Sequence, residues 1–215
     1  MWWDIAPAIR EEFEHWHSHE HFPERMSIEG FRRGSRFRSA SGGDGFFVIY
    51  ELDDYETLTS AQYLARLNAP TPWSTKMMPQ HRNMVRSQCR VVASFGGGIA
   101  QSLLTLRLPR QGAEEALRAK LSSALSRLPL LPGITAAHLL RTDTPPVRAT
   151  REQLIRGGDK HADWIALVSG YDARVVADTV NTQLGGQRLA SPGSQADVVS
   201  DLFALSYTVT PADVS

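Results

Sequence analysis

Histidine is concentrated in one short stretch, where four of the seven histidines occupy alternate positions: His15, His17, His19 and His21. A helix turns about 100° per residue, so His15 and His19 share one side while His17 and His21 share another. The four imidazoles therefore do not converge on one ion, and a zinc site needs three or four ligands. We expect His15 and His19 to form a solvated face, and we predict no metal site.

Glu20 lies in the same predicted helix, whose apolar positions recur at helical spacing: Ile9, Phe13 and Trp16. This spacing brings Glu20 onto the buried side, in the last turn, where the helix dipole disfavours an anion. A carboxylate placed there needs a partner or a chemical role. Glu20 either pairs with an arginine or serves as an acid, a base or the group that orients His21. The candidate arginines are Arg25, Arg32 and Arg36.

His21 lies at the end of this helix, just before Pro23, where the turn could aim its imidazole into a pocket. An imidazole titrates near neutrality and can pass protons, although it could equally cap the last carbonyls of the helix. We predict that His21 transfers a proton with Glu20 behind it. Arg25 or Arg36 would hold the negative charge that develops.

Aromatic and basic residues of the first half are candidates for the wall of an apolar pocket. Tyr50 could instead belong to the core, and Trp73 with His81 could simply close one end of the fold. The predicted substrate-binding residues are Trp16, His17, Arg36, Phe37, Tyr50, Trp73 and His81.

The elements that must position these residues follow the same order twice, strand-helix-strand-strand-helix-strand. Pro23 is expected to end the first helix, the first strand has only residues 1–5 available, and residues 142–160 read as a long connection. The predicted helices are Ile9–His21, Leu58–Leu67, Ala113–Leu128 and Ala173–Leu184. The other predicted strands are Arg32–Ser39, Phe46–Leu52, Arg90–Phe95, Ser102–Leu108, Thr135–Arg141, Trp164–Ser169 and Leu202–Val209.

This order predicts an α+β chain of two tandem ferredoxin-like repeats, residues 1–98 and 99–215, with the site in the first. Phe46–Tyr50 and Trp164–Val168 are apolar on both alternating faces, so each strand needs cover on both sides. Helices can cover one side and the sheet of the other repeat can cover the second. We therefore predict a sandwich resembling an α/β barrel, formed within one chain.

A motif in the first repeat resembles the dimeric α/β barrel superfamily, in its EthD-like branch. The motif runs from Trp16 to Arg25, with Gly30-Phe31 and Arg36-Phe37 after it. The resemblance implies a pocket between helices and sheet, and chemistry on small organic molecules: cofactor-free monooxygenation, lactone isomerisation, polyketide cyclisation, decarboxylation or, in distant relatives, haem chemistry. Phe37 departs from relatives that often carry tyrosine there, which removes one phenolic donor.

Composition narrows the class of protein. Lysine plus arginine equals aspartate plus glutamate, 23 each, so no basic excess indicates nucleic acid or an acidic membrane surface. The single cysteine, Cys89, cannot form an internal disulfide, and no apolar run is long enough for a membrane helix. Gly96–Gly98 lacks the spacing of a phosphate loop, and Ser191–Ser194 is no nucleophile elbow. We expect a cytoplasmic protein, with a homodimer as an option.

The sequence as a whole favours an enzyme without a cofactor, performing lyase, isomerase, cyclase or monooxygenase chemistry on an apolar or aromatic compound. Three alternatives stay open. The chain could bind such a compound without chemistry, it could bind haem through a histidine, or it could be a purely structural duplicated barrel.

Overall fold

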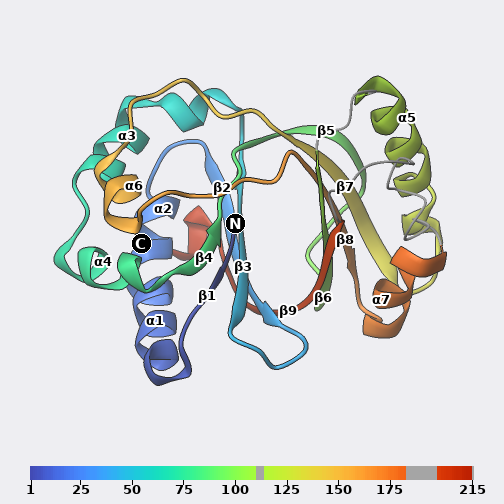
Figure 1. Ribbon diagram of the computed structural model, residues 1–215, viewed down its shortest axis with the longest axis horizontal. Coiled ribbons are helices and arrows are strands. Elements are labelled where there is room, and N and C mark those ends of the chain that lie inside the picture. The colour runs from blue at the N-terminus through green and yellow to red at the C-terminus, as the bar shows by residue number, and fades with distance from the viewer. Residues whose placement is uncertain (110–113, 183–197, 215) are drawn as a thin grey trace. The chain divides into compact units, whose positions relative to one another are not determined.

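The structure, a computed structural model, describes residues 1–109, 114–182 and 198–214 (Figure 1). Its contacts divide the chain into two compact units. The first comprises Met1–Gln88, Thr144–His161 and Ser206–Ser215, and the second Cys89–Asp143 and Ala162–Leu205. The sequence predicts one boundary along the chain, at 98/99. In the structure the division is not a single cut, because residues 144–161 belong to the first unit although the second unit has already begun before them.

The first unit holds a sheet with the strand order β4-β1-β3-β2-β9, in which β9 contributes its last residues. The pairs β1–β3, β1–β4 and β2–β3 are antiparallel, and the helices gather on one side of these strands (Figure 1). Its strands are β1 (Trp2–Asp4), β2 (Phe31–Ser39), β3 (Gly45–Leu52), β4 (Arg82–Val85) and the end of β9 (Val199–Val209). Its helices are α1 (Arg10–Trp16), α2 (Phe22–Met26), α3 (Ala61–Asn68), α4 (Pro72–Met77) and α6 (Arg151–Arg156).

The second unit has the order β9-β6-β8-β7-β5, and its β5–β7, β6–β8, β6–β9 and β7–β8 pairs are antiparallel. Its other strands are β5 (Cys89–Gly96), β6 (Ser102–Leu108), β7 (Ile134–Thr142) and β8 (Trp164–Gly170), with helices α5 (Glu114–Leu125) and α7 (Ala173–Thr182). The order β9-β6-β8-β7 matches β4-β1-β3-β2 of the first unit. The predicted α+β class, with antiparallel strands and helices, is confirmed. Residues 183–184 of the predicted last helix, and Ser191–Ser194, lie outside the described residues.

The first helix does not end before Pro23, and that prediction is wrong. α1 passes into a π-helical turn at His17–His21 and then into α2, which ends at Met26. The amide of Phe22 donates to the carbonyl of His17, five residues back. Pro23 then lies in the first turn of α2, a helix position at which proline is tolerated. The wider turn therefore lets the chain stay helical through the proline.

Two segments that the sequence predicts to be loops contain helices in the structure. Thr71, within the predicted proline-rich loop, caps α4 because its hydroxyl accepts a hydrogen bond from the amide of Ser74 at 3.0 Å. In the predicted connection 142–160, Thr150 and Gln153 form a reciprocal capping box that starts α6. Both helices pack in the first unit, where α6 contacts α3 and the turn after α4.

Gly34 in β2 shows how tightly aromatic rings pack on the first sheet. A Cβ there would lie 2.6 Å from Cε1 of Phe22 and 3.1 Å from Cε1 of Tyr50. We expect Gly34→Ala to lower the free energy of unfolding by about 1–3 kcal/mol, measured by urea titration, because both rings must shift. Gly43→Ala is the control, since its nearest neighbour would be 3.9 Å away. Equal effects of the two substitutions would argue against this packing.

Candidate functional site

A small cavity lies within the first unit, beside the π-helical turn. Its volume is about 40 Å³, which is room for a few water molecules and far less than the several hundred Å³ of a typical ligand pocket. The lining residues are aromatic, methionine, histidine and one arginine: Met1, Trp3, Trp16, His17, His21, Tyr50, Met78, His81, Met84 and Arg156.

Five residues of this lining carry a buried polar atom that has no hydrogen-bond partner among the described residues. These atoms are Trp3 Nε1, His17 Nδ1, His21 Nδ1, Tyr50 Oη and Arg156 Nε. Buried polar groups in folded proteins are nearly always paired, because an unpaired one costs about 1–3 kcal/mol. Such a concentration around one cavity indicates a place that receives polar atoms from water or a ligand.

The three histidines of the cavity are neutral near pH 7. Burial, and then the positive charge of nearby arginines, holds the pKa of His17 and of His21 well below the usual value of 6.5. Burial also lowers the pKa of His81, to about 4. Its Nδ1 lies 2.9 Å from the carbonyl oxygen of Met78. Nδ1 must therefore be the protonated nitrogen, which leaves Nε2 of His81 as a free acceptor.

Aromatic neighbours fix the imidazole rings in place. The ring of His21 lies 4.7 Å from that of Trp16 and 5.3 Å from that of His17. The ring of Trp3 packs at 4.8 Å on His81. His17 and His21, at the two ends of the π-helical turn, line the same cavity. The sequence predicts that these two histidines share one side of the helix. His15 and His19, in contrast, are exposed and pack on each other.

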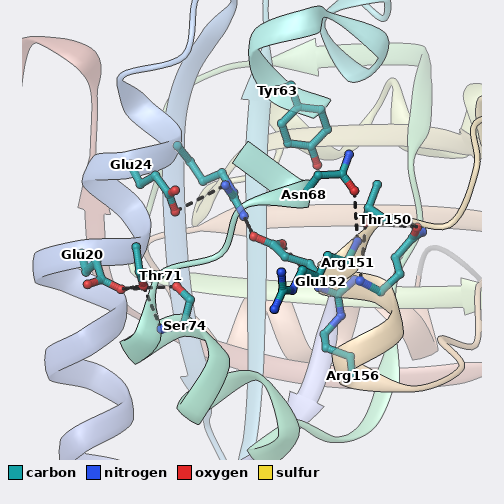
Figure 2. Close-up of polar contacts among 12 residues, drawn as sticks. Glu20, Glu24, Tyr63, Asn68, Thr71, Ser74, Thr150, Arg151, Glu152 and Arg156 are labelled. Carbon is teal, nitrogen blue, oxygen red and sulfur yellow. Dashed lines mark hydrogen bonds and ion pairs between the residues drawn. The ribbon is translucent and has the colours of Figure 1, made fainter. Parts of the chain in front are cut away.

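Glu20 contacts neither His21 nor an arginine. Its Oε1 accepts a hydrogen bond from Trp16 Nε1 at 3.1 Å. It also accepts hydrogen bonds from Thr71 Oγ1 at 2.5 Å and from Ser74 Oγ at 3.3 Å (Figure 2). Glu20 therefore ties the π-helical turn to α4 and sets the orientation of the Trp16 indole, which forms one wall of the cavity.

Arg25 belongs to a buried ionic network rather than to the cavity lining. Its guanidinium pairs with Glu152 of α6 and, at 3.5 Å, with Glu24. Burial opposes the charged form, but the contact with Glu152 prevails and raises the pKa of Arg25. Arg156 pairs with Glu152 at 3.6 Å and with Asp159 at 3.1 Å. The network thus fastens α6 beside the cavity (Figure 2).

The remaining predicted residues lie away from the cavity. Phe37 packs on Phe47, and Trp73 packs on His15. Arg36 donates to the carbonyl of Glu14 at 3.2 Å and to Ser206 at 3.3 Å, and burial lowers its pKa to about 10. Of the predicted set, the structure brings together Trp16, His17, His21, Tyr50 and His81.

Sequence reasoning missed Met1, Trp3, Met84 and Arg156 of the lining. The capping box at Thr150 could have predicted the start of α6 from the sequence. No pattern in the neighbouring sequence indicates that α6 packs within the first unit. Within the described ranges, no group of three or more histidine, cysteine, aspartate or glutamate side chains is arranged to hold a metal ion. No helix in those ranges combines the length and apolarity needed to cross a membrane.

Solved structures share this fold at low sequence identity. An anthrone oxidase-like protein matches with a TM-score of 0.65 and 14% identity, over 100% of this chain and 92% of its own. A protein assigned as a monooxygenase from Fusobacterium nucleatum matches with a TM-score of 0.59 and 6% identity, over 97% of this chain and 91% of its own. Another, from Lactobacillus acidophilus, matches with a TM-score of 0.57 and 9% identity, over 98% of this chain and 93% of its own.

No protein-family model and no curated protein matches the sequence. At these identities the likeness concerns the fold alone. It agrees with the α+β fold predicted from the sequence, and it does not test the EthD-like branch.

Proposed function

We propose that the chain is an enzyme without a cofactor that removes a proton from a small aromatic compound at the histidine cavity. The observation that carries this proposal is a pair of neutral imidazoles, the buried His17 and the half-buried His21, beside unpartnered hydrogen-bond donors in one cavity. A neutral imidazole can accept a proton at pH 7, and the donors can receive the charge that is left behind.

His21 is the proposed base. Burial disfavours its imidazolium form, so the proton moves readily only when an anion forms beside it and the two charges pair. Arg25, which lowers the pKa of His21 through its charge, acts from outside the lining. His17 and His81 complete the set of acceptors. Lyase, isomerase, cyclase and monooxygenase reactions can all begin with this step.

An aromatic substrate is larger than the cavity, so side chains must move to admit it. Three of the lining residues are methionines, Met1, Met78 and Met84. Methionine is unbranched and flexible and adapts to ligands of different shape. We propose that these side chains give way while the aromatic walls, Trp3 and Trp16, hold the ring.

The test is proton exchange at the acidic methylene of anthrone, chosen because a protein of this fold is described as anthrone oxidase-like. Under argon in D₂O, NMR should show exchange catalysed by the wild type. His21→Ala should slow it by about 10²–10⁴-fold, the usual contribution of a positioned base. The melting temperature should fall by only a few degrees (about 1 kcal/mol), because Nδ1 of His21 has no hydrogen bond to lose and only the ring contacts with Trp16 and His17 are removed.

His19→Ala is the matched control, because His19 belongs to the same turn but is exposed. Full exchange activity in His21→Ala would show that His21 is not the base. Tight anthrone binding without exchange in the wild type would favour a binding protein instead. A Soret band in the purified protein would favour haem binding.

We further propose that the chain is a tandem ferredoxin-like duplication of the EthD-like branch. The common strand order of the two units supports the duplication. The boundary at 98/99 stays a prediction from the sequence, and β5, which it assigns to the first repeat, belongs to the second unit. A homodimer and a cytoplasmic location remain predictions from the sequence.

A further inference from the structure

We propose that Arg156 holds the substrate oxygen on which negative charge develops, and that the substrates are therefore aromatic compounds bearing a phenol or enol oxygen. This inference rests on the proposed function and names its substrate class. Arg156 comes from α6, which lies in the segment 144–161 that returns to the first unit.

The segment is anchored on both sides of Arg156. Before it, Glu152 pairs with Arg25, and the amide of Arg151 donates to Asn68 Oδ1 at 3.2 Å (Figure 2). After it, the amide of Lys160 donates to the carbonyl of Met84 at 3.2 Å. Leu154 of α6 is 72% exposed whereas Glu152 is 2% exposed. Charged groups therefore dock the helix where Glu152 is buried, and Leu154 takes no part in the docking.

This docking leaves one nitrogen of the Arg156 guanidinium for a ligand. Nη1 faces Glu152 at 3.6 Å and Nη2 faces Asp159 at 3.1 Å. The side chain is 8% exposed, and its Nε is buried without a partner among the described residues. Because a guanidinium is planar and rigid, fixing two of its nitrogens also fixes the direction of the Nε–H.

Two further donors belong to the same lining. Trp3 Nε1 carries a hydrogen and can only donate, and the hydroxyl of Tyr50 stays protonated because burial raises its pKa. All three donors lack partners within the described chain. An oxygen that gains negative charge in the reaction would receive hydrogen bonds that strengthen as the charge grows.

The step balances without an oxidant or a cofactor. An O–H or acidic C–H bond of the substrate breaks, the proton goes to the imidazole of His21, and the electron pair remains on the substrate as a phenolate or enolate. Glu152 and Asp159 already neutralise the charge of Arg156. Arg156 therefore supplies a directed hydrogen bond, which suits a phenol or enol oxygen better than a fully charged carboxylate.

The experiment compares 4-nitrophenol, whose phenolate is coloured, with nitrobenzene, which lacks the hydroxyl. Wild-type protein should bind both and lower the pH at which bound 4-nitrophenol ionises. Arg156→Met should weaken phenolate binding by about tenfold to a hundredfold, the range for a hydrogen bond to a charged group. Nitrobenzene binding should change less than about twofold, which lies within the usual scatter of such measurements.

Arg156→Lys is the control for loss of folding. Its ammonium can still pair with Glu152 and Asp159, but it offers no Nε–H. It should lose phenolate preference as the methionine variant does. Arg151→Met, an exposed arginine on the same helix, should behave as wild type. If either Arg156 variant keeps wild-type phenolate affinity, Arg156 does not hold the oxygen, while the role of His21 stands. If the wild type binds neither compound, the aromatic cavity itself is refuted.

Discussion

Arg25→Met is expected to lower the free energy of unfolding by about 3 kcal/mol, the lower end for a broken buried pair, because Glu152 keeps only the more distant Arg156, 3.6 Å away, as its partner. Arg25 is 3% exposed and Glu152 is 2% exposed, so water cannot replace the lost partner. The loss should appear in urea titration at pH 7 as a lower midpoint. It should be accompanied by detachment of α6, since Glu152 is the buried anchor of that helix.

Arg33→Met is the matched control, because Arg33 donates two hydrogen bonds of 2.8 Å to Glu51 but both side chains are about one-third exposed. An exposed pair of this kind is worth about 1 kcal/mol or less. In the double variant Arg25→Met with Glu152→Gln, much of the loss should be recovered, because Glu152, the most deeply buried carboxylate of the network, is then replaced by a neutral amide. An Arg25 variant no less stable than the Arg33 variant would refute the structural role of this pair.

The fold was readable from the sequence where local pattern decides structure. β3 and β8 lie within a residue of their predicted bounds, because β-branched and aromatic residues form continuous runs there. β1 is three residues long, as expected from the short stretch before the first helix. Antiparallel pairing followed from the repeated order of elements, which permits few topologies.

The site was readable only in part, because two of its features are not local. The π-helical turn depends on how the chain passes Pro23, and it changes where Glu20 lies relative to the side that His17 and His21 share. Glu20 consequently turns to α4, while His17 and His21 both face the cavity. The spacing of Ile9, Phe13 and Trp16 could not reveal this shift, since a regular helix was assumed throughout.

The sequence could not identify Arg156 as a residue of the cavity, for a second reason. It lies 135 positions after His21 along the chain, in a stretch whose two prolines and two glycines read as a connection. Only the return of residues 144–161 to the first unit brings it to the cavity. A capping box predicts that a helix begins, but the partner of that helix is decided by buried charges distant in sequence.

Acid is expected to destabilise the protein well before its carboxylates titrate. His17, His21 and His81 have pKa values lowered from 6.5 by burial. Above pH 6.5 they are neutral in both states and have no effect. Below it the unfolded chain binds their protons and the folded chain does not, so the free energy of unfolding falls as pH falls. For His81 the fall continues to about pH 4.

Each histidine contributes at most about 1.4 kcal/mol per pH unit, a limit that is approached about one unit below 6.5, so the three together give a slope that rises toward about 4 kcal/mol per unit near pH 5. Glu24 opposes part of it, because burial raises its pKa and its folded form takes up a proton early. Urea titrations at several pH values measure the slope. His81→Gln should reduce it by about a third, whereas His19→Gln, whose ring lies in solvent, should leave it unchanged. A slope unaffected by His81→Gln would mean that this imidazole is not held neutral, and the proposed acceptor role of the cavity would lose its electrostatic basis.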